Sequence, residues 1–131
     1  MATILVVDDE PAICTIMQEF LESRGYRVKT ALSGPTALTT IQDDPPDVIL
    51  LDLLMPGMNG LQVLCRLYEM GLADRVIIQT GSRNEPLLLT TMLLDVFEIL
   101  LKPADLDEIE FAVMLKLALG TDDSHCRPEG P

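Results

Sequence analysis

Residues that build metal and redox sites are scarce in this chain. It has no tryptophan, a single histidine at His125, and three cysteines at Cys14, Cys65 and Cys126 with no Cys-x-x-Cys spacing. Zinc sites need clustered cysteine and histidine ligands, so we do not expect one. Because the cysteine count is odd and Cys14 and Cys65 fall inside apolar helical patterns, we predict reduced, buried thiols and a cytoplasmic location.

Basic residues are also few. Lys and Arg number 9 against 21 Asp and Glu, and the formal net charge is −12. This charge argues against direct binding of nucleic acid or an anionic membrane, and it suits a basic partner surface or a cation site. Simple solubility explains the charge equally well. No apolar stretch reaches transmembrane length, because Asp95 and Glu98 interrupt the longest one, and no signal peptide is predicted.

What the chain does contain is a regular alternation of short apolar runs and amphipathic stretches. The apolar runs predict strands at 3–7, 27–31, 48–51, 75–79 and 97–101, and the stretches predict helices at 9–25, 33–44, 61–71, 85–94 and 104–119. Such alternation predicts an α/β fold: a doubly wound, five-stranded parallel sheet with helices on both faces. We expect one domain at 1–119 and a flexible C-terminal tail at 120–131.

Apolar residues at helical spacing predict which side of each helix faces the sheet. The predicted stripes are Ile13, Ile16, Met17, Phe20 and Leu21 in the first helix, Ala37, Leu38 and Ile41 in the second, Leu61, Leu64, Cys65 and Tyr68 in the third, and Leu106, Ile109, Val113 and Leu117 in the last. Phe111, Met114 and Leu115 fall outside the last stripe, and 86–94 carries no charge. This excess predicts a contact patch, although a deeper core would also explain it.

Polar residues stand where four of the predicted strands end. Asp8 and Asp9 follow the first strand, with Asp9 as the expected N-cap of the next helix. Asp52 follows the third strand, Thr80 the fourth and Lys102 the fifth. Ligands bind at the carboxyl ends of the strands in doubly wound sheets, so we expect these side chains to meet at one edge.

The chemistry of this set indicates phosphoryl transfer. Carboxylates gathered at one edge repel each other unless a cation joins them, and oxygen ligands suit Mg²⁺. An aspartate nucleophile at Asp52, a hydroxyl donor at Thr80 and a fixed positive charge at Lys102 complete what the reaction requires. Each feature alone has a simpler explanation, such as helix capping by Asp8-Asp9 or a solvated charge at Lys102.

In these residues the chain resembles the receiver domains of two-component response regulators, over roughly residues 2–119. The matching features, in order, are the acidic pair Asp8-Asp9, the segment Asp52-x-x-Met55-Pro56-Gly57-Met58-x-Gly60, Thr80 followed by Gly81, and Lys102-Pro103. Any one of them is a weak signal, whereas all four in order, each after its own strand, are highly specific. The resemblance implies a flavodoxin-like (βα)5 fold with strand order 2-1-3-4-5.

The resemblance also implies a role for each site residue. Asp52 would accept a phosphoryl group from a histidine kinase or phosphotransfer protein, and Thr80 and Lys102 would contact that group. Mg²⁺ would be held by Asp9, Asp52 and the Leu54 main-chain carbonyl, with Asp8 in support. Domains of this kind act as signalling substrates and switches rather than as metabolic enzymes, and their self-catalysed phosphorylation and dephosphorylation is their only chemistry.

The chain departs from the family pattern at two places. The family usually has an aromatic residue three positions before the lysine, and this chain has Ile99 there. In the family that ring swings inward as the threonine side chain moves toward the phosphoryl group, so this switch is in question here. Leu54 offers no polar group to a hydrolytic water, which predicts a long phosphoryl lifetime. The face of helix 4, strand 5 and helix 5 is the expected contact with a second copy or an output domain.

Three other functions deserve comparison. A pseudo-receiver would use the same fold for docking or dimerisation without phosphorylation, and Ile99 and the apolar face favour it slightly. A flavodoxin-like cofactor binder needs a phosphate loop after the first strand, where Asp8-Asp9-Glu10 would repel phosphate. A phosphatase of the haloacid dehalogenase type needs a second acid where this chain has Leu54.

Overall fold

The computed structural model of the chain describes residues 1–53, 60–80, 98–101 and 105–126. Its elements in chain order are β1 (Thr3–Val7), α1 (Pro11–Ser23), β2 (Arg27–Ala31), α2 (Gly34–Asp43), β3 (Val48–Asp52), α3 (Gly60–Glu69), the 3₁₀ turn η1 (Ala73–Arg75), β4 (Val76–Thr80), β5 (Glu98–Leu101) and α5 (Leu106–Cys126). All five strands lie within one residue of their predicted bounds. The helix predicted at 85–94 lies outside the described residues.

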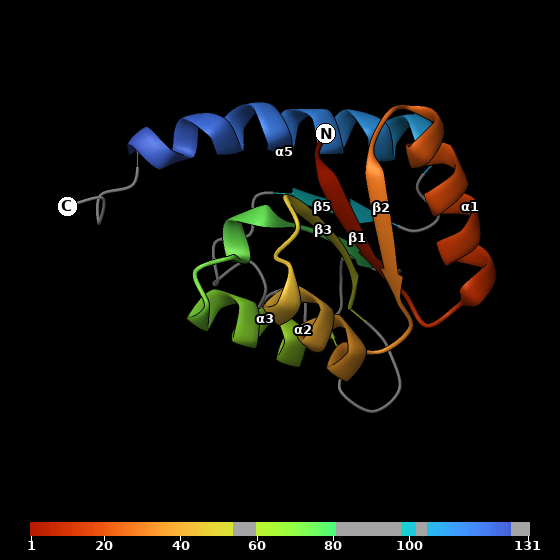
Figure 1. The fold of residues 1–131 in the computed structure, drawn as a ribbon, viewed down its shortest axis with the longest axis horizontal. Coiled ribbons are helices and arrows are strands. Elements are labelled where there is room, and N and C mark those ends of the chain that lie inside the picture. Colours follow the sequence, from red (N-terminus) through yellow and green to blue (C-terminus); the bar gives the residue numbers. More distant parts are fainter. Residues whose placement is uncertain (54–59, 81–97, 102–104, 127–131) are drawn as a thin grey trace.

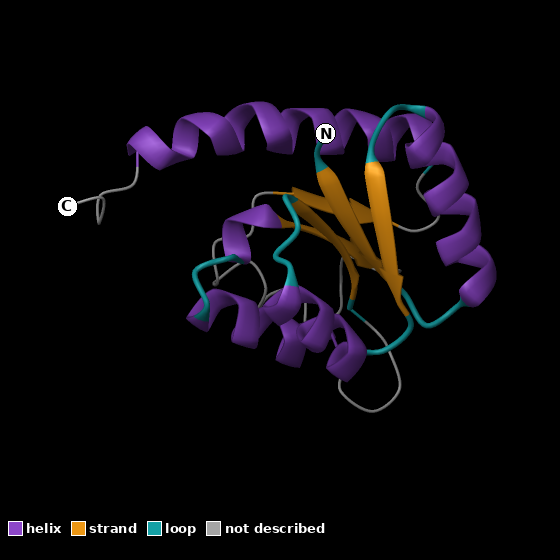
Figure 2. Cartoon of the chain, in the orientation of Figure 1, coloured by secondary structure: helices purple, strands orange, loops and turns teal. Residues whose placement is uncertain are grey.

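The strands form one parallel sheet in the order β2-β1-β3-β4-β5. Helices α1 and α5 lie against one face of this sheet, and α2 and α3 lie against the other (Figure 1). Figure 2 shows the resulting three layers, with the strands between two layers of helices. The predicted strand order and the doubly wound arrangement of the described elements are therefore confirmed.

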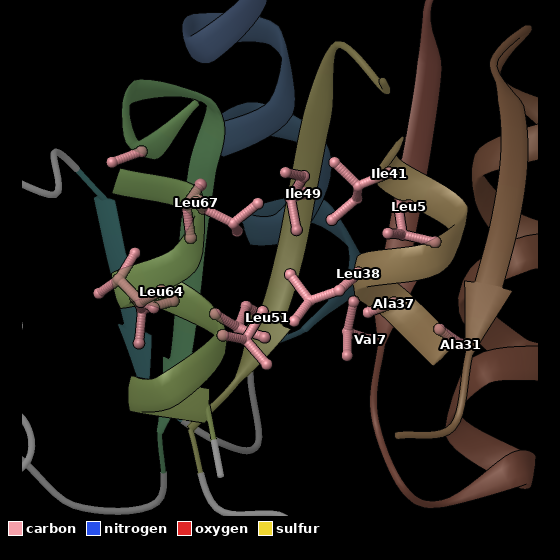
Figure 3. Packing of buried hydrophobic residues seen from close by; sticks show 14 of the residues in the cluster. Leu5, Val7, Ala31, Ala37, Leu38, Ile41, Ile49, Leu51, Leu64 and Leu67 are labelled. Carbon is pink, nitrogen blue, oxygen red and sulfur yellow. The ribbon is translucent and has the colours of Figure 1, made fainter. Parts of the chain in front are cut away.

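The face covered by α2 and α3 is a continuous apolar core, which we name the α2/α3 core. Alternate residues of β1 and β3 point into it, among them Leu5, Ile49 and Leu51. Leu38 and Leu64 from the two helices close over them (Figure 3). Because β3 is buried on both faces, its sequence is an unbroken apolar run up to Asp52.

The opposite face packs against α1 and α5 and forms what we name the α1/α5 core. Ile4 and Leu50 from the strands meet Leu21 of α1 and Val113 of α5 there. The predicted stripe of α5 is confirmed, since Leu106, Ile109, Val113 and Leu117 all belong to this core or pack against it. The predicted stripe of α1 is wrong at Ile16, which is half exposed, while Cys14 is buried in its place.

The third helix is rotated by one residue from its prediction. Val63, Leu64 and Leu67 are buried, whereas Cys65 and Tyr68 are exposed. Residues next to each other on a helix differ by about 100° around its axis, so a stripe set one residue off still contains one correct member, here Leu64. The prediction that both Cys14 and Cys65 are buried thiols is right for Cys14 and wrong for Cys65.

The last helix also differs in length from its prediction. It begins at Leu106 rather than residue 104 and continues beyond Leu119 to Cys126. Gly25 and Gly71, with φ of 96° and 77°, follow α1 and α3 in the left-handed conformation that stops a helix. Gly120 instead lies inside α5, and a glycine inside a helix weakens it by about 1 kcal/mol without breaking it.

The second helix begins as a capped helix should. Ser33 is its N-cap, and the Ser33 hydroxyl accepts from the Thr36 backbone N–H at 3.3 Å. Pro35 lies in the first turn, where a backbone N–H would have no partner within the helix, so the lack of one in proline costs no hydrogen bond. None of the helices in the described part of the chain is long and apolar enough to span a membrane.

Candidate functional site

Three carboxylates gather at the carboxyl edge of the sheet. Asp8 follows β1, Asp9 comes next, and Asp52 is the last residue of β3. One carboxylate oxygen from each lies within 4.8 Å of the other two. Asp8 and Asp52 are 1% and 5% exposed, while Asp9 remains accessible to solvent. The predicted convergence of these three residues is therefore confirmed, and we name them the acidic cluster.

Hydrogen bonds hold Asp8 at its N–H, its carbonyl and its carboxylate. Its N–H donates to the Ala31 carbonyl of β2 at 3.1 Å, and its carbonyl accepts from the Cys14 thiol at 3.4 Å. Its carboxylate Oδ1 accepts from the Glu10 N–H at 3.0 Å. These bonds tie the acidic cluster to β2 and to the first turn of α1.

The same bonds correct the predicted cap of the first helix. The N-cap of α1 is Glu10, without a side-chain hydrogen bond, rather than Asp9. Pro11 follows at the first helical position and has no N–H to be capped. The Asp8 carboxylate takes the Glu10 N–H instead. Asp9 therefore does not cap the helix, and its carboxylate belongs to the acidic cluster.

Gly60 lets the chain pass directly behind Asp52. The Gly60 N–H donates to the Leu53 carbonyl at 2.7 Å. A Cβ at position 60 would overlap the Asp52 carbonyl oxygen and the Leu53 backbone, closer than real side chains approach. The last glycine of the segment Asp52-x-x-Met55-Pro56-Gly57-Met58-x-Gly60 is thus a steric requirement, because only glycine permits α3 to begin so near the Asp52 backbone.

The composition of the acidic cluster suits a hard divalent cation. Like charges this close raise each other's free energy unless a cation joins them. Mg²⁺ takes one or two carboxylates and retains waters or phosphate oxygens in its other positions. The cluster offers two buried carboxylates and one accessible one, so Asp8, Asp9 and Asp52 fit Mg²⁺ in donor chemistry.

The other predicted site residues are described in part or not at all. Thr80 is the last residue of β4, the strand next to β3, and its backbone alone is described. Ile99 lies in β5 as the register partner of Ile78. Leu54 and Lys102 lie outside the described residues, so their predicted roles stay predictions.

The site also contains a residue that the sequence analysis did not select. Gln79 of β4 is buried, with 3% of its surface exposed, and is the register partner of Asp52. Its side-chain Nε2 donates to Met17 Sδ of α1 at 3.9 Å. The available signal was a lone amide at the end of the apolar run from Val76, immediately before Thr80.

A family model and two curated relatives match the chain. The family model for the response regulator receiver domain matches residues 4–114. Sporulation initiation phosphotransferase F of Bacillus subtilis is 34% identical over 116 residues, which cover 88% of this chain and 94% of that protein. The alkaline phosphatase synthesis transcriptional regulatory protein PhoP of the same organism is 36% identical over 128 residues. That match covers 98% of this chain but 43% of the longer relative.

Solved structures share the fold. A response regulator receiver domain protein from Clostridium thermocellum superimposes with a TM-score of 0.85 at 28% identity, covering 92% of this chain and 98% of its own. A receiver domain protein from Methanospirillum hungatei reaches a TM-score of 0.88 at 23% identity, covering 94% and 98% of the two chains. At that identity the second match supports the fold alone.

Proposed function

The chain belongs to the response regulator receiver family, and we propose that Asp52 accepts a phosphoryl group in a Mg²⁺-dependent reaction. The donor is the phosphohistidine of a histidine kinase or phosphotransfer protein. The observation that carries this proposal is the acidic cluster, whose three carboxylate oxygens lie within 4.8 Å at the carboxyl edge of the sheet. A signalling role follows from the family, and the assignment of the chemistry to Asp52 is our own.

Asp52 is better placed as the nucleophile than Asp8. The Asp8 carboxylate is committed to holding the start of α1, where it accepts the Glu10 N–H. Asp52 ends its strand, where the chain turns away from the sheet. Asp9 is accessible to solvent, so it lacks the excluded environment that strengthens electrostatic interactions at a reaction site.

The reaction joins an Asp52 carboxylate oxygen to phosphorus and breaks the phosphorus–nitrogen bond of the donor. The imidazole leaves with the bonding electron pair and takes up a proton, so an acyl phosphate on Asp52 and a neutral histidine result. Mg²⁺, when bound at the acidic cluster, would supply positive charge that offsets the negative charge of the transferred group. Asp9, Asp52 and the Leu54 main-chain carbonyl would hold the cation, with Asp8 in support, and a carboxylate oxygen of Asp52 would attack phosphorus. Thr80 and Lys102 are the proposed contacts for the transferred group.

The outer side of α5 supports a contact with a partner. Phe111, Met114 and Leu115 are 62%, 53% and 36% exposed, as their place outside the core stripe predicts. We include this apolar surface in the proposed interface with a second copy or an output domain. The same observation favours the second candidate function, a pseudo-receiver that docks or dimerises without being phosphorylated.

One experiment separates the two functions. The chain is incubated with acetyl phosphate and Mg²⁺, and its intact mass is measured over time. Phosphorylation at Asp52 predicts a gain of one phosphoryl group that disappears in Asp52→Asn and in the presence of a Mg²⁺ chelator. A wild-type chain whose mass never changes would overturn the proposal and leave the docking module.

Static light scattering on the same samples tests the interface. We expect wild type to associate more strongly with beryllofluoride and Mg²⁺ than without them. Phe111→Ser, at a position that is already exposed, should weaken this association without altering phosphorylation. A chain that stays monomeric in both states would remove α5 from the proposed interface.

A further inference from the structure

We propose that Cys14 is a positioning residue, whose thiol holds the peptide between Asp8 and Asp9 in the orientation that the proposed Mg²⁺ site needs. This inference rests on the proposed function and adds one residue of α1 to it. The Cys14 thiol donates to the Asp8 carbonyl at 3.4 Å. Cys14 is 4% exposed, so solvent competes little for this bond.

The Asp8 carbonyl belongs to the peptide that joins two members of the acidic cluster. A peptide group is planar, so the direction of this carbonyl also sets the direction of the Asp9 N–H and the position of the Asp9 Cα. The Asp8 N–H, on the other side of the residue, donates to the Ala31 carbonyl at 3.1 Å. Asp9 is exposed, and an exposed side chain gains little support from packing. Its place in the cluster therefore depends on the peptide that carries it.

The start of α1 holds the thiol in place. Cys14 is the fourth residue of this helix, and its N–H donates to the Glu10 carbonyl at 3.2 Å. The Glu10 N–H in turn donates to the Asp8 carboxylate at 3.0 Å. The backbone of Glu10 and the side chain of Cys14 thus restrain the carboxylate and the carbonyl of Asp8 from one helix end.

Position 14 makes two demands that cysteine meets together. The side chain belongs to the α1/α5 core, so it must pack among apolar groups. It must also offer a donor to the Asp8 carbonyl. A thiol packs as a small apolar group and still carries a weak S–H donor. An apolar side chain would lose the donor, and a hydroxyl would cost more to remove from water.

Two substitutions that remove the donor test the proposal, because Cys14→Ala is smaller than cysteine and Cys14→Val is larger. We expect both to raise the dissociation constant for Mg²⁺ about threefold, which corresponds to the loss of one weak hydrogen bond. Titration calorimetry measures it. The rate constant of phosphorylation by acetyl phosphate at saturating Mg²⁺ should stay within about twofold of wild type, because the bound cation restores the arrangement.

Wild-type Mg²⁺ affinity in both variants would overturn the proposal. Wild-type affinity in Cys14→Val alone would overturn it too, because bulk rather than the donor would then be what position 14 supplies.

Leu21→Val is the matched control, since Leu21 is buried in the same core near the C-terminal end of α1. It should lower the free energy of unfolding and leave the Mg²⁺ affinity of the folded protein within about twofold of wild type. If Leu21→Val weakens Mg²⁺ binding as much as Cys14→Ala does, a general loosening of α1 explains the effect and Cys14 has no positioning role.

A spectroscopic measurement on the unaltered thiol remains decisive if the variants at position 14 do not fold. A chain carrying Cys65→Ser and Cys126→Ser keeps Cys14 as its only thiol. We expect its infrared S–H stretching band at a lower frequency than that of a thiol without an acceptor. A band at the frequency of a thiol in an apolar solvent would overturn the proposal, since the bond to the Asp8 carbonyl would not exist.

The two proposals fail in different ways. A wild-type chain that binds Mg²⁺ but is not modified by acetyl phosphate defeats the proposed function, and the Mg²⁺ affinities of the Cys14 variants still test the role of Cys14. A wild-type chain that is modified, with both Cys14 variants binding Mg²⁺ as tightly as wild type, defeats only the role of Cys14.

Discussion

The two faces of the sheet are built differently. The α2/α3 core is made of apolar side chains alone among the described residues. The buried polar and charged side chains among the described residues are Asp8, Asp52, Gln79 and Lys116. Strand alternation puts Asp52 and Gln79 on the α1/α5 face, where Gln79 contacts Met17 of α1. Both faces belong to the same five strands, and β3 alternates between them, with Leu51 on one side and Leu50 and Asp52 on the other.

This difference separates stability from chemistry. Apolar burial contributes free energy of folding in proportion to area and places no demand on direction. Buried polar groups must meet their partners in defined geometry, so they are retained where they serve a purpose. We infer that the α2/α3 core chiefly stabilises the domain, while the α1/α5 face gives up part of that stabilisation to hold the acidic cluster.

The largest expected effect comes from comparing two neighbours in β3. Leu51→Ala and Leu50→Ala each remove a fully buried side chain and should lower the free energy of unfolding by about 2–5 kcal/mol. Urea denaturation measures both. Leu51→Ala should leave the Mg²⁺ affinity of the folded protein within about twofold of wild type, because its cavity opens away from the acidic cluster.

Leu50→Ala should weaken Mg²⁺ binding more, because its cavity lies on the face that supports Asp52. Titration calorimetry under native conditions gives both affinities. Equal changes in Mg²⁺ affinity for the two substitutions would contradict the inference that only the α1/α5 face supports the acidic cluster.

The second prediction concerns Mg²⁺ itself. Binding to the folded state alone, at a free concentration of about 100 times the dissociation constant, should raise the free energy of unfolding by about 2.7 kcal/mol. Asp8→Asn removes one of three clustered charges and should lose most of this gain. With a chelator present, the same variant should be more stable than wild type, because less repulsion remains. Urea denaturation that shows no Mg²⁺ dependence in wild type would refute the cation site.

The third prediction uses the close approach at Gly60. Gly60→Ala must displace the Asp52–Leu53 backbone, and we expect a loss of about 1–3 kcal/mol of stability together with slower phosphorylation. Gly71→Ala is its control, since Gly71 has open space around it and a positive φ. It should lower stability without changing phosphorylation. Parallel loss of phosphorylation in both variants would show that Gly60 has no special link to Asp52.

The smallest effect is expected at the rim of the α2/α3 face. Lys29 Nζ lies 2.7 Å from Asp44 Oδ2, and this hydrogen bond, with the Lys29 charge, lowers the pKa of Asp44 below its usual 3.8. A lowered pKa stabilises the fold at pH above 3.8, and that contribution disappears as pH falls through the folded-state pKa.

Lys29→Met should therefore raise the pKa of Asp44 toward 3.8, as measured by NMR titration of its carboxyl carbon. The free energy of unfolding near pH 7 should change little, because exposed ion pairs contribute little to stability. A large loss of stability would mean that charge matters on this face as well, against the comparison of the two faces.

Patterns that depend on neighbours in sequence were predictable. Alternation of apolar runs located all five strands, and the serine before α2 was recognised as the start of that helix. Because parallel strands end at a common edge, sequence order alone brought Asp8, Asp9 and Asp52 together.

Features that depend on contacts in space were missed. The Asp8 carboxylate accepts the Glu10 N–H, and Glu10 rather than Asp9 is the N-cap of α1. The face of α3 is set by its start at Gly60 behind Asp52, one residue away from the predicted stripe. Gln79 was read as part of an apolar run, since its place beside Asp52 follows from the register of the two strands.

The length of α5 has a mechanical consequence. Its 21 residues make a rod of about 30 Å, and its C-terminal turns extend beyond the sheet (Figure 1). The first half is anchored in the α1/α5 core through Ile109 and Val113. A tilt of about 5° at that anchor would move the far end by roughly 2 Å. A helix held at one end is a lever arm, so a small repacking of the α1/α5 core would be enlarged at the far end of α5.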